Sequence, residues 1–384
     1  MSFHCRLSAA FIFVGLTLSA VIGENKPLPI ERRDQCRSTL DVALGVAHRM
    51  NDHYYSGGYG NSWTDSNTLE DLHNLMLAAG SDDFGSVADN SAAGKAALDP
   101  NTNWDNFGFG YNDDSSWLTL ALWKIGDYKA ARGGNSSPYF NSALKVYNII
   151  VGQWDGTCGG GVWWSKDHTY KNAITNELFL LLSAQGYVRF GDPAFLNNAQ
   201  LAWNWLKNSG MRNSDGLWND GLDTKTCKNN GGNTWTYNQG VIASGLGYLA
   251  KATGDSSYLT EAEITLDATI THLTQNNILK ESCDDPNPDG VNCGGDGFLF
   301  KGLWTKHVQY YLDAANDAGR TAKYAPFLWS QSSAVFHYAT GSTNDPGSVW
   351  FASNNGGSVF TGVSSASGLE AHVAAAKYGT CRSE

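Results

Sequence analysis

The sequence predicts an all-α protein assembled from repeated helical hairpins. Apolar residues recur at helical spacing along most of the chain. Similar helix-opening segments return at intervals of roughly 60 residues, which is typical of an α-helical array. The chain has 384 residues, of which 42% are hydrophobic, so its composition is globular and its length suits one large domain.

The N-terminal part of the predicted array contains two helices and a long loop. Residues 34–51 and 67–79 each place leucine and methionine side chains on one face at helical spacing. Residues 80–106 are polar and irregular, so we expect a non-helical stretch there. Loops of this length are usually functional or disordered.

Residues 107–123, FGFGYNDDSSWLTLALW, predict the next helix and the most distinctive chemistry of the chain. Asn112 or Asp113 is expected at the N-cap, which places Asp113 and Asp114 in the first turn. Acidic residues are common there, so a well-capped helix explains them without any function. Alternatively, the two carboxylates compete for ionisation, which should raise one pKa while the other stays low. A proton donor and a nucleophile that work together require such a split.

The second half of the chain repeats one arrangement of helices. Helices are predicted to open near Pro138, Pro193, Ser257 and Pro326. More apolar helices lie between these openings, at residues 172–189, 236–252 and 300–316. About eleven helices can be counted, and six hairpins of roughly 60 residues would fill the chain. The pattern therefore predicts an (α/α)6 toroid of inner and outer helices. An open solenoid is the alternative, although its repeats would be shorter and more alike.

Four loops next to the apolar helices combine glycine, tryptophan and polar side chains. They span residues 158–172, 216–223, 229–240 and 283–304. Aromatic rings offer flat faces to sugars, and Asn, Asp and Gln offer hydrogen bonds to hydroxyl groups. If the loops meet at one end of the array, they predict a cleft for a neutral carbohydrate.

The N-terminus predicts export. His4 and Arg6 precede an apolar run that ends at small residues, so we expect a signal peptide over residues 1–23. Residues 24–33 would then form a short pro or linker segment, and residues 34–384 a single catalytic domain. The rest of the chain shows neither an apolar run of membrane-spanning length nor a hydrophobic C-terminal tail. We expect a secreted extracellular monomer without a stable membrane anchor, either free or associated with a cell wall.

Cysteine usage agrees with an oxidising compartment. Cys5 would leave with the signal peptide, and six cysteines would remain. Only one pairing can be predicted, between Cys283 and Cys293, because turn-forming residues fill the short segment between them. Asn135 begins an N-x-S/T sequon in a Gly/Ser-rich loop and is a candidate glycosylation site.

Several other chemistries find no support in the sequence. A formal charge of −11 and the lack of a basic stripe argue against nucleic acid. Nucleotide-binding, serine-nucleophile and histidine metal motifs are missing. Residues 285–296 match part of a calcium-loop pattern, but a disulfide-closed surface loop explains them better. We therefore expect no metal and no cofactor. Carboxylate chemistry remains, and its further candidates are Asp105, Glu177, Asp220, Asp223 and Asp296.

Four motifs, in order, resemble glycoside hydrolase family 76. They are YNDDSSW, GGGVWWS…YKNAITNELF, TWTYNQG and FLFKG, and the resemblance runs from about residue 34 to residue 336. The family comprises α-1,6-mannanases and related fungal cell-wall proteins. The resemblance implies an (α/α)6 fold and retaining chemistry on α-1,6-linked mannose. It also implies that Asp113 is the nucleophile and Asp114 the general acid/base.

The expected function is that of a secreted retaining endo-α-1,6-mannanase acting on mannan or mannooligosaccharides. Two alternatives remain open: a transglycosylase of cell-wall mannan or glycosylphosphatidylinositol glycan, and a mannan-binding protein without turnover. The residues expected to bind the sugar are Trp63, Asn67, Asn172, Asn176, Trp235, Tyr237, Asn238 and Gln239.

Overall fold

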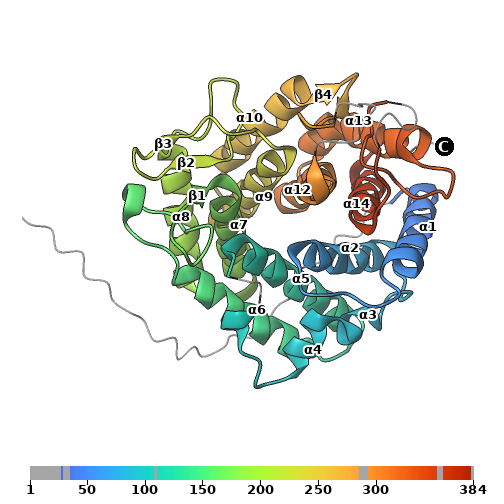
Figure 1. Cartoon of the computed structure of the whole chain (residues 1–384), viewed down its shortest axis with the longest axis horizontal. Coiled ribbons are helices and arrows are strands. Elements are labelled where there is room, and N and C mark those ends of the chain that lie inside the picture. Colours follow the sequence, from blue (N-terminus) through green and yellow to red (C-terminus); the bar gives the residue numbers. More distant parts are fainter. Residues whose placement is uncertain (1–26, 29–34, 108–109, 285–292, 353–357, 382–384) are drawn as a thin grey trace, which may run out of the picture.

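The chain forms two concentric rings of helices (Figure 1). The computed structural model describes residues 27–28, 35–107, 110–284, 293–352 and 358–381. The inner helices are buried on almost every side, as helices without a solvent-facing stripe must be. They are α2 (Trp63–Ala79), α5 (Asn112–Ala131), α7 (Ala173–Phe190), α9 (Thr236–Thr253), α12 (Phe300–Ala315) and α14 (Gly362–Tyr378).

The outer helices bury one face and expose the other. In α8, for example, Phe195, Ala199, Ala202 and Leu206 are buried at helical spacing, while Leu201 is exposed. The outer helices are α1 (Arg37–Tyr54), α6 (Ser137–Val151), α8 (Pro193–Asn208), α10 (Ser257–His272) and α13 (Ala318–Ala334). The short helices α3 (Val87–Asn90) and α4 (Ala92–Leu98) lie in the remaining part of the outer ring (Figure 1).

Contacts between the inner helices close the ring. Each inner helix contacts the next one along the chain, and α14 contacts α2. The packing is close: a side chain at Gly302 of α12 would overlap the backbone of Ser367 in α14. The (α/α)6 toroid predicted from the repeats is therefore confirmed. An open solenoid is wrong because the first and last inner helices bury their apolar faces against each other.

Two predictions about local structure are wrong. Residues 80–106 are not a continuous loop, since they contain α3, α4 and the 3-10 helix η1 (Trp104–Asn106). Pro326 does not open a helix but lies inside α13. That helix starts earlier because Asp317 caps it, accepting a hydrogen bond from the backbone N–H of Arg320 at 2.8 Å.

The strands are short and belong to the connecting loops. Strands β1 (Lys171–Asn172), β2 (Gly221–Asp223) and β3 (Lys228–Asn229) form an antiparallel sheet in that order. Its register pairs Asn172 with Gly221. Strands β4 (Thr274–Gln275) and β5 (Ile278–Leu279) form a hairpin. The other short segments are η2 (Thr157–Gly159), α11 (Gly294–Gly297) and the π-helix η3 (Val335–Ala339).

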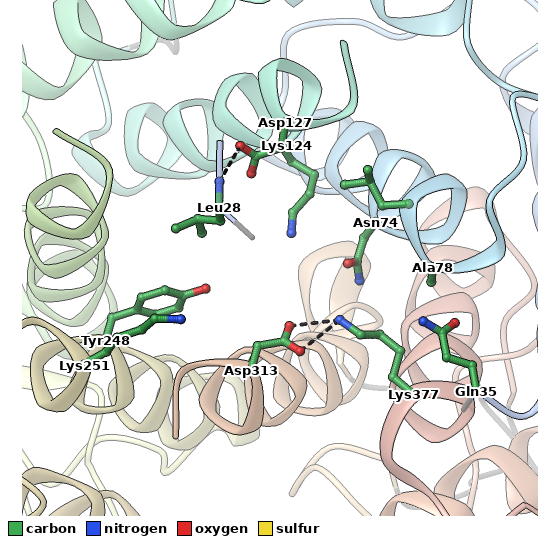
Figure 2. Close-up of a pocket in the computed structure, with 11 residues that line it drawn as sticks. Leu28, Gln35, Asn74, Ala78, Lys124, Asp127, Tyr248, Lys251, Asp313 and Lys377 are labelled. Atoms are coloured by element: carbon green, nitrogen blue, oxygen red, sulfur yellow. Dashed lines mark hydrogen bonds and ion pairs between the residues drawn. The ribbon is translucent and has the colours of Figure 1, made fainter. Parts of the chain in front are cut away.

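The two ends of the ring differ. Inner helices begin at one end, where a cleft of about 600 Å³ opens between them. Their C-terminal halves enclose a space of only about 60 Å³ at the other end (Figure 2). There Lys377 donates two hydrogen bonds of 3.0 Å to Asp313, and the backbone N–H of Leu28 donates to Asp127 at 3.3 Å. The ring is therefore open at the N-terminal ends of its inner helices, where the unpaired N–H groups favour negative charge.

Three disulfides fix the ends and loops of the chain. The predicted pair, Cys283 and Cys293, is confirmed. Cys158 joins Cys227, which ties the loop before α7 to the loop before α9. Cys36 joins Cys381, and the N–H of Cys36 donates to the carbonyl of Ala376 at 2.9 Å. The two ends of the described domain are thus held together beside α1 and α14.

Candidate active site

The cleft at the open end combines aromatic rings with four carboxylates. Its volume, about 600 Å³, is typical of ligand-binding sites. The lining residues are Trp63, Tyr111, Asp113, Asp114, Trp117, Trp164, Tyr170, Asn172, Asp220, Tyr237, Asp296 and Phe300. Such a surface can stack sugar rings and supply acid groups at the same time.

The start of α5 is fixed by the loop before α7. The backbone N–H of Asn112 donates to the carbonyl of Trp164 at 2.8 Å, and its side chain donates to the carbonyl of Trp163 at 2.7 Å. The prediction that Asn112 or Asp113 caps this helix is wrong, because the N-cap is Tyr111 and makes no side-chain cap. The side chain of Asn112 hydrogen-bonds to the loop before α7 instead. The glycine-aromatic run before it includes residues 108–109, which lie outside the described residues.

Asp113 is half-buried and is held by one tryptophan. The indole N–H of Trp164 donates to Oδ2 of Asp113 at 3.1 Å. Burial and, to a smaller extent, the charge of Asp220 raise the pKa of Asp113 to about 7. The hydrogen bonds from Trp164 and from the backbone oppose this shift because they stabilise the charged form.

Asp114 has the more strongly raised pKa of the two. Burial raises the pKa of Asp114 to about 8, and the charges of Asp113 and Asp296 contribute. The prediction that one pKa would stay low is wrong, because both carboxyl groups lose water in the cleft. Their surroundings still differ: the hydrogen bond from Trp164 favours the charged form of Asp113, whereas the charge of Asp296 further disfavours the charged form of Asp114.

Two of the other candidate carboxylates line the cleft. The hydroxyl of Tyr170 donates to Oδ2 of Asp220 at 2.6 Å, which partly offsets the rise in the pKa of Asp220 caused by burial. The indole N–H of Trp63 donates to Oδ1 of Asp296 at 3.0 Å.

The remaining candidate carboxylates do not line the cleft. Asp105 and Asp223 are exposed, and Asp223 accepts hydrogen bonds from the backbone of its own turn. Glu177 is fully buried, and its burial raises its pKa well above the usual value. Within the described residues, no group of three His, Cys, Asp or Glu side chains is placed to hold a metal ion. Positions 285–289 of the calcium-like motif lie outside the described residues.

Of the eight residues predicted to bind sugar, three line the cleft. Trp63 stands at its rim, and Asn172 lies at the start of α7, where its side chain also accepts from the N–H of Thr175 at 3.3 Å. Tyr237 stacks on Phe300 with ring centroids 4.1 Å apart. These three offer two aromatic faces and one amide.

The other five predicted sugar-binding residues do not line the cleft. Asn67, Asn176, Asn238 and Gln239 are fully buried, and Trp235 packs against Phe300. The side-chain oxygen of Asn176 accepts from the N–H of Val162 at 2.7 Å, and the side-chain oxygen of Gln239 accepts from the N–H of Trp218 at 2.8 Å. These amides satisfy backbone groups of the loops that shape the cleft.

Five aromatic residues of the cleft were not predicted as site residues: Tyr111, Trp117, Trp164, Tyr170 and Phe300. All of them lie within or beside the glycine-rich motifs. Aromatic residues in glycine-rich loops were therefore a better signal for the cleft than amides at the starts of helices.

The closed double ring and its aromatic, acidic cleft are those of an (α/α)6 glycoside hydrolase. Residues 43–379 match the model of glycosyl hydrolase family 76. This match covers most of the chain, which therefore belongs to that family. No helix among the described residues is long and apolar enough to cross a membrane.

Fungal proteins are among the relatives by sequence. The chain is 25% identical over 334 residues to a putative mannan endo-1,6-alpha-mannosidase of Schizosaccharomyces pombe, covering 82% of this chain and 71% of that protein. It is 27% identical over 211 residues to the mannan endo-1,6-alpha-mannosidase DFG5 of Candida albicans. The second match covers 51% of this chain and 45% of the relative, so the alignment spans less than half of that protein.

Solved structures share the fold. The GH76A alpha-1,6-mannanase of Salegentibacter has a TM-score of 0.74 at 21% identity, covering 88% of this chain and 99% of that one. Dfg5 of Chaetomium thermophilum, in complex with glucosamine, has a TM-score of 0.76 at 18% identity, covering 88% and 89%. An inactive Salegentibacter variant, with two consecutive aspartates changed to asparagine, is in complex with alpha-1,6-mannotriose; its TM-score is 0.73 at 21% identity, covering 88% and 99%.

Proposed function

We propose that this protein is a retaining endo-α-1,6-mannanase that works through a mannosyl-enzyme intermediate. The observation that carries the proposal is the adjacent pair Asp113 and Asp114 in the aromatic cleft, where both carboxyl groups have raised pKa values. The choice of α-1,6-linked mannan as the substrate rests on the fungal relatives, which are named mannan endo-1,6-alpha-mannosidases. The inactive relative that binds mannotriose lacks two consecutive aspartates, which supports a catalytic role for such a pair.

In this proposal Asp113 is the nucleophile. The indole of Trp164 donates to Oδ2 of Asp113, which stabilises and orients the carboxylate that attacks the anomeric carbon. Asp114 is the general acid, because its surroundings favour the protonated form most strongly. It protonates the departing glycosidic oxygen and then, as a carboxylate, removes a proton from the water that releases the mannosyl chain from Asp113.

We assign sugar binding to the cleft residues rather than to the buried amides. Trp63 and Tyr237 offer faces to the pyranose rings, and Asn172 offers an amide to hydroxyl groups. Asp220 and Asp296 each have one oxygen held by an aromatic donor, so the other oxygen of each carboxyl group is available for a sugar hydroxyl.

Azide rescue of two variants tests the roles separately. Asp113→Ala removes the covalent step and should lower kcat/KM by several orders of magnitude on every substrate. Asp114→Ala should form the mannosyl-enzyme from an activated aryl α-mannoside, because that leaving group needs little protonation. Azide should then release α-mannosyl azide with net retention.

Azide with Asp113→Ala should instead give the β-azide by a single displacement. The opposite pattern of products would show that Asp114 is the nucleophile and Asp113 the general acid/base. Near-native rates in both variants would show that the pair serves only the helix start and that the active site lies elsewhere.

The same enzyme incubated with linear α-1,6-mannan distinguishes hydrolysis from its alternatives. We expect short oligomers to accumulate with time. Longer products would show transfer to a carbohydrate acceptor, and an unchanged size distribution would show binding without turnover.

Catalysis should need no cofactor. Two carboxylates suffice for glycosyl transfer with retention, so full activity is expected after exhaustive treatment with EDTA. Loss of activity that calcium restores would contradict this expectation and would direct attention to residues 285–296.

We also propose that the protein is exported as a monomer after removal of residues 1–23. Three disulfides support an oxidising compartment, and the sequon residue Asn135 is exposed. N-terminal sequencing of secreted protein should locate the mature end before residue 35. A mobility shift after enzymatic deglycosylation, lost in Asn135→Gln, checks the glycan.

A further inference from the structure

A second groove, outside the catalytic cleft, lies on the outer surface of the ring. Its volume is about 580 Å³, close to that of the cleft. It runs between α13, the β4–β5 hairpin and the π-helix η3. Figure 1 shows β4 beside α13 in the outer ring. Its side chains include Asn276, Trp329, Ser330, Ser333, Tyr338 and Phe351.

The hairpin wall of this groove is held rigidly. Asn276 and Asn277 adopt positive φ angles of 53° and 66°, as a two-residue hairpin turn requires. The side chain of Gln331 in α13 donates to the carbonyl of Asn277 at 3.0 Å and accepts from the N–H of Leu279 at 2.8 Å. The buried amide of Gln331 therefore fixes the hairpin against the helix, and the groove exists before any ligand binds.

The opposite wall presents aromatic side chains to solvent. Tyr338 is 47% exposed, on a π-helix that continues directly from α13. Such helices are uncommon and often mark functional sites. Trp329 is only partly buried, and the hydroxyl of Ser330 donates to the carbonyl of Pro326, which leaves its oxygen free to accept.

The chemistry of the groove matches a neutral carbohydrate. Aromatic rings, hydroxyls and one amide line it, and none of its lining residues carries a carboxylate or another charge. Aromatic side chains can cover the apolar faces of pyranose rings, while the polar groups pair with sugar hydroxyls. Without an acid pair, the groove can hold a sugar chain but cannot cleave it.

The groove lies at the same end of the ring as the cleft. Helix α12 starts at Phe300 in the cleft and reaches Asp313 at the narrow end. Helix α13 follows it after a two-residue turn and returns, so its last residues lie at the cleft end. The hairpin follows α10, which returns in the same way from α9. A polymer longer than the cleft could therefore contact both sites.

We propose that this groove is a non-catalytic binding site for the polysaccharide, in which Trp329 and Tyr338 hold a stretch of α-1,6-linked mannose outside the cleft. The identity of the sugar rests on the proposed function. The groove would raise the affinity for long chains and leave the handling of short oligosaccharides unchanged.

Affinity electrophoresis through gels containing α-1,6-mannan tests binding without turnover. The test protein carries Asp113→Asn and Asp114→Asn, with or without Trp329→Ala and Tyr338→Ala. We expect the groove changes to weaken retardation by mannan about fivefold, since each ring contributes a modest stacking interaction. Phe336→Ala is the matched control, because Phe336 is 39% exposed beside the groove but lines a different pocket.

Kinetics on the active enzyme separate this proposal from the proposed function. Trp329→Ala with Tyr338→Ala should raise KM for long mannan about fivefold and leave kcat/KM for mannotetraose unchanged. An unchanged KM for long mannan and unchanged retardation would overturn the groove proposal. Failure of the wild-type enzyme to cleave mannan would overturn the proposed function alone, because retardation in the gel still reports on the groove. Thermal unfolding of each variant identifies any change that merely destabilises the fold.

Discussion

At the residue scale, the chemistry of the cleft depends on which of two neighbouring carboxyl groups loses its proton first. Burial raises the pKa of both Asp113 and Asp114, but the hydrogen bond from Trp164 favours the charged form of Asp113. In the proposed mechanism, the productive state has Asp113 ionised and Asp114 protonated. Because the groups interact, activity will report two pKa values of the pair.

The first prediction concerns the pH dependence of kcat/KM. Below a pH of about 7, Asp113 takes up a proton and the nucleophile is lost. Above a pH of about 8, Asp114 loses its proton and the acid is lost. A narrow bell centred between these values is expected with an unactivated mannooligosaccharide. A profile that is flat from pH 5 to pH 9 would contradict it.

Replacing one of two neighbouring carboxylates should move only one limb of the pH profile, and each replacement should move a different limb. The charge of Asp220 raises the pKa of Asp113, so Asp220→Asn should move the acid limb to lower pH. The charge of Asp296 raises the pKa of Asp114, so Asp296→Asn should move the alkaline limb to lower pH. Asp223→Asn is the control, because Asp223 is exposed and does not line the cleft. Movement of both limbs in every variant would contradict the assignment.

Trp164→Phe should reduce activity through Asp113. The change removes the indole N–H that donates to the carboxylate at 3.1 Å but keeps an aromatic ring. A hydrogen bond to a charged group contributes about 1.5 to 3 kcal/mol, so kcat/KM should fall roughly ten- to hundredfold. The acid limb should move to higher pH, since the charged form has lost a donor. A loss of activity without that movement would indicate a role in sugar binding instead.

At the scale of elements, one buried lysine connects three inner helices. Lys306 of α12 contacts Glu70 and Asp71 of α2, at 3.1 and 2.8 Å, and Glu370 of α14 at 2.8 Å. All four side chains are buried. These carboxylates keep the pKa of Lys306 raised despite its burial. The cluster lies where the first and last inner helices meet, and we expect it to fix how the ring closes.

Lys306→Met should therefore lower the free energy of unfolding by about 3 to 5 kcal/mol, because it leaves buried carboxylates without their cation. Denaturant unfolding measures the change. Lys207→Met is the matched control, since Lys207 is half-exposed and its contacts are a surface pair with Glu261 and a cation–π contact with Trp203. Its effect should stay within about 0.5 kcal/mol. Equal effects of the two changes would show that the cluster does not hold the ring together.

At the scale of the whole molecule, Cys36–Cys381 connects residues 345 positions apart, whereas Cys283–Cys293 connects residues 10 positions apart. In the chain-entropy account of disulfides, the longer loop restricts the unfolded chain more. Changing both cysteines of the long-range pair to serine should lower the free energy of unfolding by about 3 kcal/mol more than changing the short-range pair. Denaturant unfolding of the two double variants gives the comparison, and the reverse order would contradict the prediction.

Local sequence patterns were enough to predict much of the helical architecture. Periodic apolar residues predicted the inner helices at 172–189, 236–252 and 300–316 within a few residues, since helical burial leaves a local trace. They did not predict the start of α13, because the side chain of Asp317 caps that helix nine residues before Pro326. They also left α14 without an assignment. This helix is buried on nearly every side, so it lacks the amphipathic stripe that identifies a surface helix.

The sequence by itself determined the fold class, the family and the adjacent pair Asp113 and Asp114, because these depend on residues close together in the chain. Only the tertiary structure decided which side chains reach the cleft. Asn176 and Gln239 resemble sugar-binding amides in sequence, yet they pair with backbone groups of distant loops. The pKa values of the two aspartates were likewise decided by folding. Burial and the charges of Asp220 and Asp296 act through space, across segments far apart in the sequence.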